Sequence, residues 1–274
     1  MRPLMHLHIL ASGSKGNAAI VEGPQGSVLI DCGISRKRLF ERAAELGVRM
    51  DRVEAAIITH EHSDHVNGLR VFAKRFEGSL IATQGTATAS QNLLNLPFTT
   101  VGNDDELMLA GMHVSTFPTS HDVCDPFGLR FTIVDEDGVI EDALGWCTDT
   151  GYLTKQAQSE LVGCRILGLE SNHDVHMLKT GPYPFFLKER VGGRHGHLSN
   201  EQCAKALPSL VTSETRTVVA LHLSEKNNRP STCVRTLAAA LGAEPTNDVF
   251  TQAQTPDGTL TILAAAQDRP LTIW

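Results

Sequence analysis

The sequence predicts an α/β domain in which short strands alternate with helices. Short apolar runs recur between polar loops, as expected for buried strands. Between them lie segments whose apolar residues are spaced three or four apart, as expected for amphipathic helices. The length of 274 residues suits one large domain or two small ones, and we expect a single domain over residues 1–274.

The first elements are expected to be a buried strand and a hairpin. Residues 6–11 begin with alternating His and Leu and continue as an apolar run. Residues 18–22 and 27–31 flank Gly23-Pro24-Gln25-Gly26, a turn sequence typical of a β-hairpin.

A helix, a strand and a second helix are expected next. Residues 35–46 place apolar side chains on one stripe, and Gly47 is a typical helix stop. Residues 55–59 are apolar and strand-like, and residues 64–76 repeat the helical spacing.

Strands and helices continue to alternate through the rest of the chain. The expected strands cover residues 112–117, 128–134, 143–147, 165–169 and 217–221, and the expected helices cover residues 154–161, 200–207 and 231–241.

The most informative segment is Thr59-His60-Glu61-His62-Ser63-Asp64-His65, directly after an apolar strand. Imidazole and carboxylate ligands suit Zn²⁺, Mn²⁺ or Fe²⁺. His60 and His62 point the same way if the backbone is extended, because side chains alternate along a strand. Asp64 and His65 follow where a turn can direct them to a second ion. The segment therefore has enough ligands to begin two metal sites.

The pattern His-x-His-x-Asp-His resembles the signature of the metallo-β-lactamase fold. Four further elements follow the order of that family, namely Asp31 in Leu29-Ile30-Asp31-Cys32-Gly33, His121 in Thr119-Ser120-His121-Asp122, Asp149 in Thr148-Asp149-Thr150-Gly151 and His222 in Ala220-Leu221-His222-Leu223-Ser224. The resemblance implies a four-layer αββα sandwich with the metals in a cleft along one edge of two sheets. Periodicity alone does not predict this arrangement.

The resemblance also implies how the metals are held. His60, His62 and His121 would hold the first metal, and Asp64, His65 and His222 the second. Asp149 would bridge the two ions. Asp31 would hydrogen-bond the histidine loop and fix the orientation of the ligands, or alternatively cap a turn.

Such a centre predicts hydrolysis. Two metals about 3.5–4 Å apart can share a hydroxide, lower its pKa and clamp the attacking and leaving oxygens. Asp64 is both a ligand and a candidate general base. The ligand set does not distinguish Zn²⁺ from Mn²⁺, and the centre suits phosphodiesters, thioesters, lactones and amides alike.

Further segments resemble the YycJ (WalJ) subgroup of this fold, which is related to the nucleases RNase Z and RNase J. They are Ala11-Ser12-Gly13-Ser14-Lys15-Gly16-Asn17, Glu170-Ser171-Asn172-His173-Asp174, Lys179-Thr180-Gly181-Pro182-Tyr183-Pro184, Arg194-His195-Gly196-His197-Leu198-Ser199-Asn200 and Leu221-His222-Leu223-Ser224-Glu225-Lys226-Asn227-Asn228. The resemblance implies an exonuclease, 5′→3′ in direction, with DNA a better candidate substrate than RNA. The alternative is a small-substrate hydrolase such as a cyclic phosphodiesterase, lactonase or thioesterase.

Several residues in these segments are candidates to act on the substrate. His197 would protonate the leaving oxygen or hold the scissile phosphate, unless it is a structural histidine. Ser14, Asn17, His173 and Ser199 are the candidate substrate-binding residues. Ser199 also fits a capping box with a Gln three residues later. For His173, lining of the cleft and a structural role at the start of a helix both stay open.

Composition adds limits to these expectations. The net charge of -7 argues against a generally basic nucleic-acid binder, but a dinuclear metal centre supplies its own positive charge. No apolar run approaches the roughly 20 residues of a membrane span, and no secretory signal is recognised, so we expect a cytoplasmic protein.

The six cysteines form no C-x-x-C pair and are expected to be reduced. The local aromatic cluster of Tyr183, Phe185 and Phe186 is expected to form the core of an insertion that covers the cleft.

Overall fold

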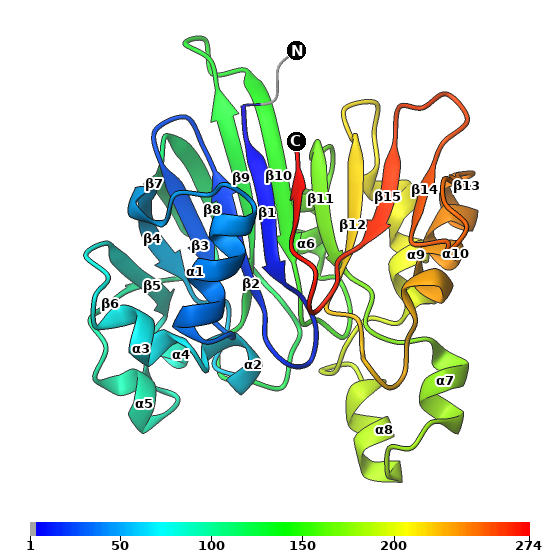
Figure 1. The fold of residues 1–274 in the computed structure, drawn as a ribbon, viewed down its shortest axis with the longest axis horizontal. Helices are drawn as coiled ribbons and strands as arrows, with labels where there is room; N and C mark the ends of the chain where they lie inside the picture. The colour runs from blue at the N-terminus through cyan, green and yellow to red at the C-terminus, as the bar shows by residue number, and fades with distance from the viewer. Residues whose placement is uncertain (1–3) are drawn as a thin grey trace. The chain divides into compact units, whose positions relative to one another are not determined.

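The computed structural model describes residues 4–274 and confirms a mixed α/β fold with two sheets. The strand order is β16-β1-β2-β3-β4-β5-β6 in the seven-stranded sheet and β13-β14-β15-β12-β11-β10-β9-β8-β7 in the nine-stranded sheet (Figure 1). The chain divides into two compact units. The first unit runs through Pro118 and includes Val123–Ala143 and Gln267–Trp274, and the second consists of Thr119–Asp122 and Leu144–Ala266.

The first unit carries the seven-stranded sheet. Its strands are β1 (His6–Ala11), β2 (Ala18–Glu22), β3 (Ser27–Ile30), β4 (Val53–Ile57), β5 (Ser79–Thr83), β6 (Phe98–Val101) and β16 (Leu271–Ile273). The predicted hairpin is confirmed, because β2 pairs antiparallel with β3 and Val21 lies opposite Val28. From β3 to β6 the pairing is parallel. The unit also contains the antiparallel strands β7 (Glu106–Leu109), β8 (Met112–Pro118) and β9 (Phe127–Val134).

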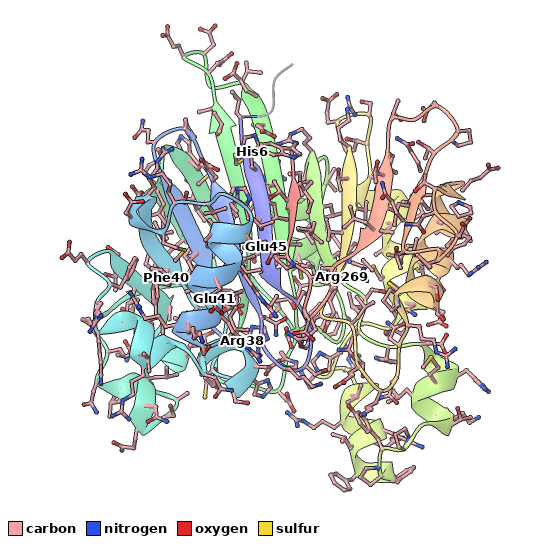
Figure 2. The ribbon with its side chains drawn as sticks, viewed as in Figure 1. His6, Arg38, Phe40, Glu41, Glu45 and Arg269 are labelled. Carbon is pink, nitrogen blue, oxygen red and sulfur yellow. The ribbon has the colours of Figure 1, made fainter. Side chains whose placement is uncertain are left out.

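The predicted helix over residues 35–46 is confirmed as α1 (Arg36–Glu45). Ser35 caps it by accepting a hydrogen bond from the backbone N–H of Arg38. Leu39 and Ala43 are buried, whereas Arg38, Glu41 and Glu45 lie on the exposed face (Figure 2). The amphipathic spacing therefore packs one stripe of this helix against the core.

The prediction of one helix over residues 64–76 is wrong. The segment forms two short helices, α2 (Ser63–Val66) and α3 (Leu69–Ala73), which are interrupted at Gly68. The backbone N–H of Gly68 donates to the carbonyl of Cys32 at 2.8 Å, and a Cβ at this position would lie 1.9 Å from the carbonyl oxygen of Ile34. Close approach to that neighbouring segment overrides the local helical spacing. The first unit also contains η1 (Met50–Arg52), α4 (Gln84–Thr88) and α5 (Gln91–Leu94).

The second unit contains a run of parallel strands. Its strands are β11 (Ile166–Glu170), β12 (Thr217–Leu221), β13 (Glu244–Pro245), β14 (Gln252–Gln254), β15 (Thr261–Ala264) and the part of β10 (Ile140–Cys147) from Leu144 onward. Cys147 lies opposite Leu169, and Glu170 lies opposite Leu221. The carboxyl ends of β10, β11 and β12 therefore meet at one edge of the sheet.

Helices connect the strands of the second unit. They are α6 (Lys155–Leu161), α7 (Val175–Thr180), α8 (Phe185–Val191), α9 (Asn200–Leu210) and α10 (Pro230–Leu241). The helices expected over residues 154–161, 200–207 and 231–241 are confirmed, with α9 extending to Leu210. Within its unit, the α7–α8 pair extends beyond the ends of the strands (Figure 1).

Two further expectations concern cysteines and membranes. All six cysteines are free thiols, five of them buried and Cys124 exposed. Within residues 4–274, no helix has the length and apolar character that a membrane crossing requires.

Candidate metal-binding residues

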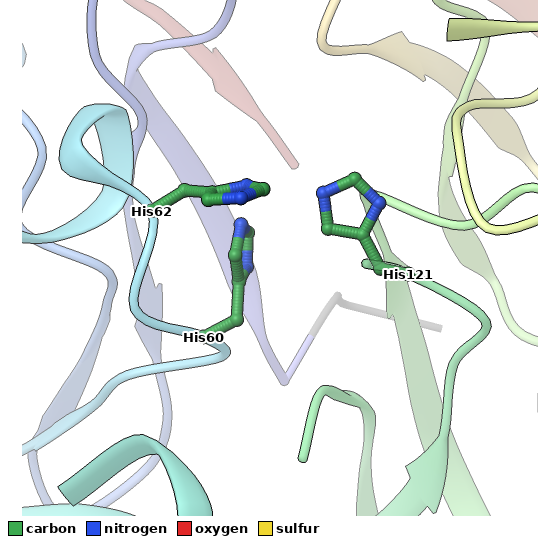
Figure 3. Close-up of side chains that lie close together, drawn as sticks. All are labelled: His60, His62 and His121. Carbon is green, nitrogen blue, oxygen red and sulfur yellow. The ribbon is translucent and has the colours of Figure 1, made fainter. Parts of the chain in front are cut away.

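The first unit gathers His60, His62, Asp64 and His65 immediately after β4. The ring centroids of His60 and His62 are 5.0 Å apart, and those of His60 and His65 are 4.0 Å apart. Figure 3 shows the ring of His62 set edge-on to that of His60. The Nε2 of His65 lies 3.6 Å from a carboxylate oxygen of Asp64. Imidazole and carboxylate groups are the ligands that divalent transition-metal ions prefer.

Asp31 forms hydrogen bonds with this histidine loop. It is 1% exposed, and one oxygen accepts from the backbone N–H of Thr59 at 2.8 Å. Its other oxygen lies 2.7 Å from the Nδ1 of His65. The Thr59 hydroxyl also donates to Asp31 and lies 3.0 Å from the Nδ1 of His60. These contacts fix the orientation of two of the proposed ligands.

Asn17 lies against two of the proposed metal ligands rather than at an open surface. Its side chain is buried, and its amide nitrogen lies 3.2 Å from a carboxylate oxygen of Asp64 and 3.0 Å from the Nε2 of His65. Its amide oxygen accepts from the backbone N–H of Gly13 at 2.8 Å. These contacts orient Asp64, and a substrate-binding role for Asn17 stays a prediction.

The second unit gathers Asp149, Glu170, His197 and His222, with one potential ligand atom of each within 4.8 Å of the others. Asp149 follows β10, Glu170 ends β11 and His222 follows β12. The meeting of three parallel strand ends therefore explains why residues distant in sequence come together. The carboxylate of Asp149 lies 3.3 Å from the Nδ1 of His222 and 3.6 Å from the Nδ1 of His197.

Glu170 is the residue to which the sequence pattern assigned no role. It is fully buried, and one oxygen lies 2.7 Å from the Nδ1 of His197 and 3.0 Å from the Nδ1 of His222. The other oxygen accepts from the backbone N–H groups of Thr150 and Leu198. Burial alone would raise the pKa of Glu170, but the charge of His197 and the two histidine hydrogen bonds lower it to about 2. A carboxylate that ends an apolar strand was the available sequence signal.

His121 lies just beyond β8 in the chain and belongs to the second unit. It is labelled in Figure 3. Its Nδ1 donates to the carbonyl of Gly196 at 2.9 Å, and its Nε2 lies 3.7 Å from a carboxylate oxygen of Asp149. The hydroxyl of the neighbouring Ser120 donates to the carbonyl of Arg194 at 2.8 Å. This hydrogen bond connects the loop of His121 to the loop that contains Arg194 and Gly196.

The orientation of the histidines fits a divalent cation. His65, His121 and His222 each place Nδ1 against a carboxylate or carbonyl oxygen, and His60 places it against a hydroxyl. In the neutral tautomer that these acceptors favour, Nδ1 carries the proton and Nε2 carries the lone pair. This is the usual state of a histidine that binds a metal through Nε2.

The backbone is strained at three of the candidate site residues. Asp31, Asp149 and His222 have φ of 58°, 53° and 54°, and each follows the end of a strand. The left-handed region costs a residue other than glycine on the order of 1 kcal/mol or more. Such strain is typical of positions where the surrounding structure directs a functional side chain.

The other candidate substrate residues lie in different settings. Ser14 is exposed in the turn before Asn17. The hydroxyl of Ser199 accepts from the backbone N–H of Gln202 at 3.1 Å and completes the capping box of α9. His173 is buried, and its Nδ1 makes no hydrogen bond within residues 4–274. Burial lowers the pKa of His173 to about 4, so its imidazole is neutral near pH 7. Asp174, not His173, caps α7.

The expectation that the aromatic cluster is a core is wrong. Phe185 and Phe186 are 77% and 72% exposed at the start of α8. The two rings lie at the start of a short helix that extends beyond the ends of the strands of its unit, so a local run of apolar residues does not predict their burial.

The chain is similar to known proteins over most of its length. The family model described as a beta-lactamase superfamily domain matches residues 27–223. The exodeoxyribonuclease YycJ of Bacillus anthracis is 33% identical over 82% of this chain and 84% of its own. The exodeoxyribonuclease WalJ of Streptococcus pneumoniae is 32% identical over 80% of this chain and 82% of its own. The crystal structure of the metallo-β-lactamase fold protein YhfI from Bacillus subtilis aligns with a TM-score of 0.68 at 14% identity, covering 98% of this chain and 99% of that one.

Proposed function

The chain belongs to the beta-lactamase superfamily and is a metal-dependent hydrolase, and we propose that it is a DNA exonuclease with a dinuclear centre. The similarity to two exodeoxyribonucleases, which extends over about four-fifths of each chain, carries the choice of substrate. DNA is favoured over RNA on the same ground, and the 5′→3′ direction is part of the proposal. Because DNA is an intracellular substrate, we place the reaction in the cytoplasm.

The proposed ligands are the residues that the family pattern indicates. His60, His62 and His121 would hold one ion, and Asp64, His65 and His222 would hold the other. The Asp149 carboxylate would serve both ions. Support comes from the donor chemistry of each unit, from the Nδ1 contacts that leave the lone pair on Nε2, and from the strained backbone of Asp149 and His222. Zn²⁺ and Mn²⁺ both fit this set.

Bound divalent ions would supply Lewis acidity that activates a water molecule and stabilises negative charge on the phosphate. The Asn17 amide orients the side chain of Asp64, whose carboxylate would serve as the general base. Asp31 keeps His65 in one tautomer throughout.

His197 is the proposed proton donor to the leaving oxygen. Its side chain is 17% exposed, whereas that of its partner Glu170 is fully buried. The Nδ1 of His197 donates to Glu170, so the transferable proton is held on Nε2. The Glu170 carboxylate stabilises the protonated ring before the transfer and orients it toward the substrate.

The decisive test is a time course on single- and double-stranded DNA labelled at the 5′ or 3′ end. Metal-stripped protein is reloaded with Mn²⁺ or Zn²⁺, and Asp64→Ala serves as the control for contaminating nucleases. Asp137→Ala, which removes an exposed carboxylate from a turn, is the matched control. We expect stepwise release of mononucleotides by the wild type and by Asp137→Ala, and no degradation by Asp64→Ala.

The position of the label reports the direction of digestion. Early loss of the 5′ label supports the 5′→3′ direction, and early loss of the 3′ label contradicts it. Full metal occupancy without DNA degradation would instead favour a small-substrate hydrolase.

A further inference from the structure

We propose that a cavity beside the histidine loop of the first unit is a subsite for one nucleotide of a single DNA strand. This inference rests on the proposed nuclease function. It places one nucleotide of the DNA strand next to the proposed metal-binding residues of the first unit. The cavity has a volume of about 510 Å³ and is lined by residues of α2, α3 and the segment around α5. That volume lies within the range of about 300–1,000 Å³ that is usual for small-molecule sites.

The proposed metal-binding loop lines part of the cavity. Two of its lining residues, Glu61 and Ser63, alternate in sequence with His60, His62 and Asp64. A ligand in the cavity therefore contacts the segment that carries the proposed ligands. Every lining residue belongs to the first unit.

Two cations line the cavity. Arg70 and Lys74 are exposed, lie one helical turn apart on α3 and its C-terminal end, and have no ion pair within residues 4–274. Some other basic residues do form ion pairs, as Arg42 does with Asp268 and Arg49 with Asp51. In a chain of net charge -7, two unpaired cations in one cavity indicate an anionic ligand.

The acidic lining residue, Glu61, forms no ion pair with Arg70 or Lys74 within residues 4–274. The carboxylate of Glu61 accepts from the backbone N–H of Cys124 at 2.8 Å and from the hydroxyl of Thr86 at 3.3 Å. Both carboxylate oxygens are thus occupied on the side of the loop where those two residues lie.

Uncharged polar groups complete the site. Asn67, Ser90 and Asn92 line the cavity, and their side chains make no hydrogen bond within the part of the chain that the structure describes. Val66 and Leu93 add apolar surface. Amide and hydroxyl donors suit phosphate and base edges, while apolar surface suits the sugar or a base face. The lining therefore offers one kind of contact for each part of a nucleotide.

A duplex does not fit a cavity of this size, so the occupant is an unpaired nucleotide at a strand end or in a frayed segment. A free mononucleotide has the same chemistry. A DNA strand is favoured over a free mononucleotide because the cavity adjoins the loop at which the proposed hydrolysis occurs. One strand can therefore reach the cavity and the loop at the same time.

The test measures binding of a twelve-residue phosphorothioate oligothymidylate, which resists hydrolysis, to the metal-loaded protein by fluorescence anisotropy. The double variant Arg70→Gln/Lys74→Gln removes both cations. Arg38→Gln/Arg75→Gln is the matched control, because it removes two exposed charges of the same unit that do not line the cavity. Asn92→Trp fills the cavity without changing its charge.

We expect Arg70→Gln/Lys74→Gln to raise the Kd at least tenfold and the control to change it less than twofold. The slope of log K against log salt concentration should fall by about 1.4, because each phosphate contact to a single strand contributes about 0.7. Asn92→Trp should also weaken binding. Thymidine monophosphate should compete far more weakly than the oligonucleotide.

Distinct outcomes separate this inference from the nuclease proposal. If the wild type degrades DNA but both double variants bind alike, the subsite is wrong and the nuclease proposal stands. If thymidine monophosphate competes as well as the oligonucleotide, the cavity binds free nucleotide and the strand assignment is overturned. If the wild type neither binds nor degrades DNA, both proposals fail.

Discussion

A single buried carboxylate, Glu170, organises two histidines and two backbone amides at the carboxyl edge of the parallel strands. A buried charge is costly unless it is paired and hydrogen-bonded. The Glu170 carboxylate accepts hydrogen bonds from all four of these groups. Its contacts determine which nitrogen of His197 and His222 carries the proton. Glu170 thereby orients His222, a proposed metal ligand, and His197, the proposed proton donor.

Glu170→Gln tests this positioning role. Loss of the negative charge disfavours protonation of His197, so kcat on DNA should fall about 10- to 100-fold, as is typical when a residue supporting a ligand is lost. The alkaline limb of the pH–rate profile should move to lower pH, which loss of structure alone would not produce. Metal content is measured in parallel, and a profile identical in shape to the wild type would contradict the role.

His197→Ala separates proton donation from metal support. The variant should lose far more activity on DNA than on bis-p-nitrophenyl phosphate, whose leaving group needs no protonation. His195→Ala is the matched control, because its imidazole contacts Ser120 instead of Glu170. Equal losses on both substrates would assign His197 to structure.

At the scale of elements, local spacing fails in the α2–α3 and α7–α8 segments. The break between α2 and α3 comes from the approach of Gly68 to Ile34 and Cys32, a contact that no local pattern contains. The α7–α8 pair likewise carries apolar residues that the fold leaves at the surface.

The exposed phenylalanines provide a prediction about stability. Phe185→Ala/Phe186→Ala should lower the free energy of unfolding by less than about 1 kcal/mol, because exposed side chains lose little burial. Phe117→Ala, at a fully buried position, should cost about 3–5 kcal/mol. Chemical denaturation of both variants provides the comparison. A large loss in the double variant would show that the two rings are buried in solution.

At the scale of the whole molecule, the proposed ligands come from both compact units, and the expectation of a single domain stays a prediction. Metal binding should stabilise the folded protein, because an ion that binds only the native state at 100 times its Kd contributes about 2.7 kcal/mol. Chelation should therefore lower the Tm by several degrees, and Mn²⁺ or Zn²⁺ should restore it.

Calorimetry of the stripped and reloaded protein measures this effect. Asp149→Asn, which weakens the proposed bridge, should show a smaller recovery than the matched surface variant Asp137→Asn. A Tm that is unchanged by chelation in the wild type would contradict metal-linked stability.

The sequence by itself determined the family, the α/β class and the candidate ligands, because His-x-His-x-Asp-His is a local pattern and Asp31, His121, Asp149 and His222 follow strand-like runs. The comparisons confirm the family, and α1 and the β2–β3 hairpin confirm the local spacing. Only the tertiary structure showed that Glu170 holds His197 and His222, 27 and 52 residues away in sequence. It also placed Arg70 and Lys74 in one cavity with Asn92. The physical reason is that hydrogen bonds and cavities depend on which strand ends and helices meet, and periodicity within one segment does not carry that information.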